Sequence, residues 1–176
     1  IVAVKRGADT VIPGGNDRLE LGDIAYFMTL RKHVQHILQI TGKGDYGEVR
    51  HMMIMGGGLT TYHVIQDKPD SVSVKVIEQS EERCRQFADM LDDPDVSIIQ
   101  GDGRDTGMLA EEGLRDMQAF AALTPYTETN ILACLAAKRM GVRKTIAMVE
   151  NMDYVSLAEK LDIGTIINKK TIAASH

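Results

Sequence analysis

Residues 52–61 read Met-Met-Ile-Met-Gly-Gly-Gly-Leu-Thr-Thr, and this stretch decides the fold of the chain. The apolar run predicts a buried strand, and the glycines that follow it at once predict a tight turn into a helix. Folds that bind dinucleotides carry G-x-G-x-x-G at such a turn, where the first glycine permits the turn and the second lets a pyrophosphate approach the backbone. Gly56 and Gly58 occupy these two positions, whereas Thr61 replaces the third glycine, which serves helix–strand packing. A glycine triplet alone is also compatible with a plain turn.

An acidic residue in register with the glycines supports the ligand-binding interpretation. Residues 74–78 read Val-Lys-Val-Ile-Glu, so Glu78 ends an apolar strand twenty positions after Gly58. A carboxylate at this place accepts hydrogen bonds from the ribose hydroxyls of an adenosine and repels a 2′-phosphate, which favours NAD or another adenine nucleotide over NADP. The alternative role for Glu78 is that of a solvated acid capping the next helix.

Strand and helix patterns alternate through the rest of the chain. We expect strands at 52–55, 73–77, 97–100, 119–123, 145–149 and 165–167. Helices are expected at 59–67, 81–91, 108–111, 128–140 and 154–161, and another is predicted to begin at Thr171. This alternation predicts an α/β fold with a doubly wound parallel, Rossmann-like sheet.

The first 41 residues have a different pattern. Apolar runs at 1–4 and 24–28 predict strands separated by turns, and the apolar residues that follow at 34, 37 and 38 have helical spacing. We therefore expect a small β-meander closed by one helix. About 40 residues cannot bury a sufficient core alone, so we interpret this part as a truncated α+β lobe. The predicted organisation is a partial lobe at 1–41, a linker at 42–51 and a dinucleotide-binding domain at 52–176.

Composition narrows the classes of function. A net charge of −5 gives no reason to expect nucleic acid as a partner. Cys84 and Cys134 lack metal-ligand spacing and are interpreted as reduced cytosolic thiols. We find no signal peptide and no apolar run near the ~20 residues that a membrane helix needs. Because the chain starts without methionine and stops where a helix is expected to begin, we expect it to be a piece of a longer protein.

Two further loops are expected at the same sheet edge as the glycines. Gln-Gly-Asp-Gly at 100–103 follows the third strand, and Leu-Thr-Pro at 123–125 follows the fourth. Ligands of such sheets lie across the carboxyl ends of the strands. Asp102 is either near the ligand or the cap of the short helix after it, and Asn130 is either a helix cap or a contact.

These motifs together resemble the TrkA family, the peripheral subunits of bacterial Trk potassium uptake systems, and more broadly the RCK or KTN domains that regulate potassium conductance. The resemblance runs over 52–176. Besides the glycine loop it rests on Val-Ile-Glu at 76–78, Gly-Asp-Gly at 101–103, Leu-Thr at 123–124, Glu-Thr-Asn-Ile at 128–131, Ala-Lys-Arg-Met-Gly at 137–141 and Tyr154. Residues 1–41 resemble the later half of the C-terminal lobe of these proteins, which implies a parent with two such units in tandem.

The resemblance implies a role for each matched position. The residues implied to hold the pyrophosphate are Gly56, Gly57, Gly58, Leu59 and Thr60. Glu78 would bind the adenosine ribose, Asp102 and Gly103 would lie near the adenine, and Thr124 and Pro125 would border the ligand. The implied ligand is NAD(H) or another adenine nucleotide, ATP or ADP. Family members often place an arginine on the fifth strand against the phosphates; Met148 stands there in this chain, so one phosphate contact is implied to be missing.

The family implies a regulator rather than an enzyme, with no catalytic residue and no metal site. The chain would be part of the nucleotide-binding subunit of a potassium uptake or transport system, cytoplasmic and peripheral to the inner face of the cell membrane. Its partners would be a membrane-embedded potassium transporter or channel subunit and copies of itself. Ligand binding would shift a cytosolic ring, formed from homodimers or a tetramer, and so gate the pore.

Two other functions stay open at this point. An NAD-dependent dehydrogenase needs a substrate domain and an acid/base residue, yet His51 and His63 flank the glycine strand rather than the carboxyl edge. A structural module that assembles the ring without a ligand is favoured by Thr61 and Met148. Self-association itself is indicated by the helices at 128–140 and 154–161, because the apolar stripe of the first is wider than one sheet face requires. Coverage of the sheet is the simpler account of that stripe.

Overall fold

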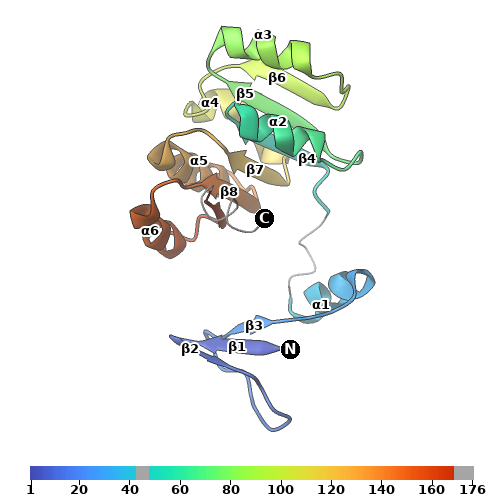
Figure 1. The fold of residues 1–176 in the computed structure, drawn as a ribbon, viewed down its shortest axis with the longest axis vertical. Coiled ribbons are helices and arrows are strands. Elements are labelled where there is room, and N and C mark those ends of the chain that lie inside the picture. Colours follow the sequence, from blue (N-terminus) through green and yellow to red (C-terminus); the bar gives the residue numbers. More distant parts are fainter. Residues whose placement is uncertain (43–47, 169–176) are drawn as a thin grey trace. The chain divides into compact units, whose positions relative to one another are not determined.

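The computed structural model describes residues 1–42 and 48–168, which belong to two units, Ile1–Gly47 and Glu48–His176 (Figure 1). The first unit has the strands β1 (Ala3–Arg6), β2 (Asp9–Val11) and β3 (Ile24–Tyr26). A 3-10 turn at Arg31–His33 leads into the helix α1 (Val34–Ile40).

The three strands of the first unit pair in the order β2-β1-β3, with both pairs antiparallel. The prediction of a meander was therefore wrong in its order, because β3 returns to the free edge of β1 instead of pairing with β2. The Arg6 guanidinium holds this return in place: its Nε and Nη2 donate to the Asp23 carboxylate at 2.9 and 2.7 Å. This pair lowers the pKa of Asp23 to about 2.

The first unit buries little apolar surface. Of its described hydrophobic residues only Val4 is buried, while Ile12 is 84% and Met28 82% exposed. A sheet of such short strands does not build a core by itself.

The second unit is built on one parallel sheet of six strands in the order β6-β5-β4-β7-β8-β9. The strands are β4 (His51–Met55), β5 (Ser73–Glu78), β6 (Val96–Gln100), β7 (Ala119–Ala122), β8 (Lys144–Met148) and β9 (Thr165–Ile167). Chain order reverses direction between β4 and β7, which makes their carboxyl ends the topological switch point of a doubly wound sheet.

Helices cover both faces of this sheet (Figure 1). They are α2 (Leu59–Gln66), α3 (Glu81–Met90), α4 (Thr106–Glu111), α5 (Thr127–Arg139) and α6 (Val155–Lys160), with 3-10 turns at Leu114–Asp116 and Met152–Tyr154. One core cluster joins Ile65 of α2 and Phe87 of α3 to one face, and the other joins Leu109, Ile131 and Ala158 of α4, α5 and α6 to the opposite face. Every residue of β7 is buried for this reason, as expected of a central parallel strand.

The Rossmann-like fold is confirmed, and each predicted strand and helix at 52–167 appears with ends that shift by two residues at most. The helix predicted to begin at Thr171 lies outside the described residues. In the part of the chain that the structure describes, no helix has the length and apolar character needed to cross a bilayer.

Candidate functional site

The turn after β4 requires glycine at its first position. Gly56 has φ +107°, in the left-handed region that side chains disfavour. A Cβ on Gly56 would lie 3.2 Å from both the backbone nitrogen and Cγ2 of Thr124. The turn therefore packs directly on the end of β7, and any side chain at Gly56 would separate the two strands. Thr61, buried in α2, donates its hydroxyl to the carbonyl of Gly56.

Glu78 is bound to the glycine loop. Its Oε2 accepts from the N–H of Gly57 at 2.7 Å, and its Oε1 accepts from the N–H of Ser80 at 2.8 Å. The residue is 6% exposed, and the side chain that caps α3 is that of Ser80, which accepts from Arg83 N–H. Glu78 is therefore neither a solvated acid nor the helix cap. A side chain at Gly57 would crowd Glu78, because a Cβ there would lie 3.1 Å from Glu78 Cβ. The absence of a side chain at Gly57 therefore lets the Glu78 carboxylate reach the loop backbone.

Gly58 opens α2 in an extended conformation, with φ −93° and ψ −178°. A Cβ at this position would meet no atom within 4 Å. The local structure therefore does not require glycine at Gly58, in contrast to Gly56. Its bare backbone leaves open the space in front of the first turn of α2.

Asn130 fixes the loop after β7. It is fully buried in the first turn of α5, and its Oδ1 accepts from the N–H and the hydroxyl of Thr124 at 3.2 and 2.6 Å. Its Nδ2 donates to the carbonyls of Thr124 and Met148 at 2.7 and 2.8 Å. Asn130 is neither a helix cap nor a lining residue; it ties the β7 loop to the end of β8. Sequence reasoning missed this role.

Asp102 is held by Arg104 at the rim of the site. Its carboxylate accepts from Arg104 Nε at 2.9 Å and from Nη2 at 2.6 Å, and this hydrogen bonding lowers the pKa of Asp102. The alternative that Asp102 caps the next helix was wrong. Asp105 is the cap of α4, since its carboxylate accepts from the N–H groups of Gly107 and Met108.

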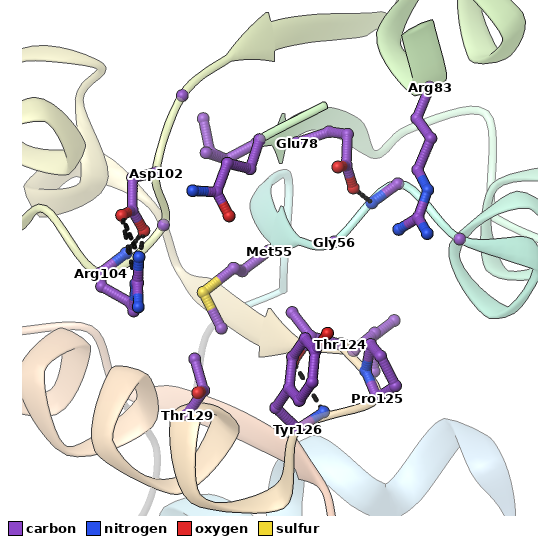
Figure 2. A pocket seen from close by; sticks show the side chains of 17 residues that line it. Met55, Gly56, Glu78, Arg83, Asp102, Arg104, Thr124, Pro125, Tyr126 and Thr129 are labelled. Carbon is purple, nitrogen blue, oxygen red and sulfur yellow. Dashed lines mark hydrogen bonds and ion pairs between the residues drawn. The ribbon is translucent and has the colours of Figure 1, made fainter. Parts of the chain in front are cut away.

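These residues surround one pocket at the carboxyl ends of β4, β5, β6 and β7 (Figure 2). Eight of the ten candidate ligand-binding residues line it: Gly56, Gly57, Gly58, Glu78, Asp102, Gly103, Thr124 and Pro125. Leu59 and Thr60 lie outside this lining, and Leu59 is 69% exposed on the first turn of α2. Met55 forms part of the lining, and the missing side chain of Gly103 makes room for it, because a Cβ there would lie 2.3 Å from Met55 Cγ.

The lining also contains residues that the sequence did not single out: Gln79, Arg83, Arg104, Tyr126 and Thr129. The sequence contained a usable signal for Arg83 as a site residue, since it lies in the first turn of the helix that follows Glu78.

Met148, by contrast, is buried in the core with Ile54 and Leu123 and does not line the pocket. No histidine or lysine lines it either, and the described residues contain no cluster of His, Cys, Asp or Glu that would hold a metal ion.

The doubly wound parallel sheet, with a glycine turn at its switch point, defines the second unit as a Rossmann-like α/β domain. More specifically, the chain belongs to the TrkA-N domain family, whose sequence model matches residues 52–169.

Relatives of known name agree with this family. The chain is 31% identical over 172 residues to the Trk system potassium uptake protein TrkA homolog 2 of Methanosarcina mazei, covering 97% of this chain. It is also 31% identical over 178 residues to the Trk system potassium uptake protein TrkA of Azorhizobium caulinodans, covering 99% of this chain. The chain spans 38% of the length of each of these relatives.

Solved structures show the same fold at low sequence identity. The TrkA-N domain of the inner membrane protein ybaL from Escherichia coli aligns with a TM-score of 0.59 at 14% identity, covering 73% of this chain and 93% of that one. The GsuK channel bound to NAD aligns with a TM-score of 0.57 at 13% identity, covering 75% and 25%.

Replacing Asn130 by Ala is expected to lower the free energy of unfolding by about 1–3 kcal/mol, because buried carbonyl groups lose their donor. Urea unfolding followed by circular dichroism measures the change. Arg139→Ala, at an exposed position of the same helix, is the control and should stay within about 0.5 kcal/mol of the unsubstituted chain. Equal stability of the Asn130 variant and this control would contradict the role given to Asn130.

Proposed function

We propose that the chain is part of the regulatory nucleotide-binding subunit of a potassium uptake or transport system, and that it is not an enzyme. Its ligand is NAD(H) or another adenine nucleotide, ATP or ADP, seated in the pocket at the carboxyl ends of the strands. The observation that carries the proposal is the glycine turn at the switch point of the sheet with the Glu78 carboxylate bonded to it. The names of the TrkA relatives support a role in potassium uptake, and the NAD-bound and ADP-bound GsuK structures support the ligand class.

The proposed ligand pose follows from the chemistry of the lining. The diphosphate lies against Gly56–Gly58 and the free N–H groups of Leu59 and Thr60, where the helix N-terminus carries a partial positive charge. A carboxylate has about four acceptor positions. Two of those of Glu78 are taken by Gly57 and Ser80, and in the proposed pose the remaining ones accept from the ribose hydroxyls.

The other pocket residues complete this pose. Asp102 and Gly103 lie beside the adenine, and Thr124 and Pro125 border the ligand from the β7 loop. Hydride-transfer enzymes usually position a His, Lys or Tyr at the reacting atoms. Among the described residues the lining holds no His or Lys and one Tyr, the exposed Tyr126, and acid/base chemistry is not part of the proposal.

Regulation requires that the ligand bind two conformations with different affinity. We propose that these conformations belong to a cytosolic ring of nucleotide domains, at the inner face of the cell membrane, that gates a potassium transporter or channel subunit. In this proposal residues 1–41 are the end of a C-terminal lobe from a preceding unit, 42–51 are the linker, and 52–176 are the nucleotide domain of the second.

Titration of the chain with NAD, NADH, ATP and ADP tests the proposed ligand class. At least one of them should bind, and Gly58→Val should abolish binding because its side chain would occupy the diphosphate path. Gly58 suits this test, since a Cβ there meets no atom within 4 Å and the variant should fold. Gly15→Val, at another open glycine, is the matched control. Unchanged affinity of a folded Gly58→Val variant would contradict the site, and no binding of any nucleotide to the unsubstituted chain would favour the ligand-free assembly module.

Glu78→Ala should weaken NAD binding by about 1–3 kcal/mol, the usual effect of losing hydrogen bonds to a charged group, and should reduce discrimination against NADP. The same change removes acceptors from Gly57 and Ser80, so thermal unfolding must be followed in parallel. Glu111→Ala, on an exposed residue of α4, controls for the loss of one negative charge. If the unsubstituted chain binds NADP as tightly as NAD, Glu78 does not have this role.

Self-association is expected through the outer surfaces of α5 and α6. Ile131 and Cys134 pack on the sheet, whereas Leu132 on α5 and Leu157 on α6 are 65% and 47% exposed. Light scattering at several concentrations should give at least a dimer mass, and Leu132→Asp should shift it towards the monomer. Arg139→Asp is the control on the same helix. A monomer mass at every concentration, with and without ADP, would leave the ring without support from this chain.

A further inference from the structure

The pocket lining holds two arginine side chains in different situations. Arg104 is engaged with the Asp102 carboxylate through Nε and Nη2. Arg83, an exposed residue of α3, makes no side-chain hydrogen bond or ion pair to any residue within 1–42 and 48–168. In the described part of the chain it is therefore the one cation of the lining whose charge is not already matched.

Arg83 is directed at the glycine loop. Figure 2 shows its side chain extending from α3 towards the loop on the side of Glu78, whereas Arg104 turns back onto Asp102. The residue lines the main pocket, and it also lines the adjoining hollow together with Gly57, Gly58 and Leu59. The Arg83 side chain thus borders the loop at Gly57 and Gly58.

Ser80 forms hydrogen bonds with both Arg83 and Glu78. The N–H of Arg83 donates to Ser80 Oγ at 3.3 Å, and the N–H of Ser80 donates to Glu78 Oε1 at 2.8 Å. Ser80 therefore positions both Glu78, proposed to meet the ribose, and Arg83, which lies beside Gly57 and Gly58.

Among the described residues, the lining on the opposite side of the site contains no cation. Met148 ends β8 as a buried, neutral side chain in the core, and the loop after β7 contributes Leu123, Thr124, Pro125 and Tyr126 to the lining, all of them uncharged. The helix N-terminus of α2 offers about half of one positive charge, which is less than a diphosphate carries. A guanidinium matches two phosphate oxygens with paired N–H groups and keeps its charge at every accessible pH.

We propose that Arg83 is the specificity-determining residue that binds the phosphate groups on the 5′ side of the nucleotide, so that the site selects phosphorylated nucleosides over the nucleoside. This inference rests on the proposed function, because it requires a nucleotide at the glycine loop. Arg83 acts there from α3, the helix that follows Glu78, and replaces a charge that β8 does not provide.

Binding of adenosine, AMP, ADP and NADP to three variants tests the inference. Arg83→Gln should weaken ADP binding by about 10- to 100-fold, the loss expected for hydrogen bonds to a charged group, and leave adenosine binding within about twofold. Arg83→Lys keeps the charge without the paired geometry and should fall in between. Arg85→Gln is the matched control, since Arg85 lies on the same helix, is paired with Glu81 and does not line the pocket. The dependence of ADP affinity on salt should also become weaker in Arg83→Gln.

Equal affinities of Arg83→Gln and Arg85→Gln for ADP would overturn the inference, as would an equal loss for adenosine and ADP, which would make the effect structural. A loss confined to NADP would assign Arg83 to the 2′-phosphate instead. If the unsubstituted chain binds none of the probes, the proposed function itself fails, whereas binding that is insensitive to Arg83 removes this inference alone.

Discussion

The close approach of the Gly56 turn to the end of β7 is the constraint on which the second unit depends. A single Cβ at Gly56 would lie 3.2 Å from the Thr124 backbone nitrogen, and the φ of +107° already disfavours a side chain there. Strands β4 and β7 are neighbours at the point where the chain reverses its winding direction. This contact allows β4 and β7 to pair where the winding direction reverses, and it also forms the bottom of the ligand crevice. The same packing therefore determines both the fold and the site.

Buried polar side chains then fix the two walls of that crevice independently. Glu78 binds the N–H groups of Gly57 and Ser80 on the β5 side, and Asn130 binds Thr124 and the Met148 carbonyl on the β7 side. Hydrogen bonds of this kind are costly to break when they are buried, which makes each wall locally rigid. Between the walls the backbone of the glycine loop is the surface that a ligand would meet.

The architecture of the second unit was predictable because its determinants are local. Apolar runs bounded by glycine and proline specify the strands, and alternation with amphipathic helices specifies a parallel sheet. Fixed spacing likewise predicted Glu78 beside the glycines. The role of Asn130 and the direction of Arg83 depend on side-chain conformations and on neighbours distant in sequence, so no local pattern encodes them. Arg104 is only two positions from Asp102, but this spacing does not by itself specify that the two side chains pair. The order of the short strands β1–β3 was missed for a similar reason, since turn residues do not specify which edge of β1 the chain pairs with.

The distribution of charge around the crevice bears on how a ligand would couple its two walls. On the β5 side the lining offers the fixed carboxylate of Glu78 and the guanidinium of Arg83, which pairs with no described residue, whereas on the β7 side Thr124 and Tyr126 are neutral. A nucleotide would thus be held by charge on the first wall and by shape and neutral hydrogen bonds on the second. Charge interactions are the stronger of the two, so a change in the width of the crevice would alter mainly the contacts with the β7 loop. Asn130 joins that loop to α5, the helix whose outer surface is proposed to meet another copy. A coupling between ligand binding and self-association would therefore run from the β7 loop through Asn130 to α5. Its coupling free energy could not exceed the difference in ligand affinity between two conformations that the neutral contacts provide.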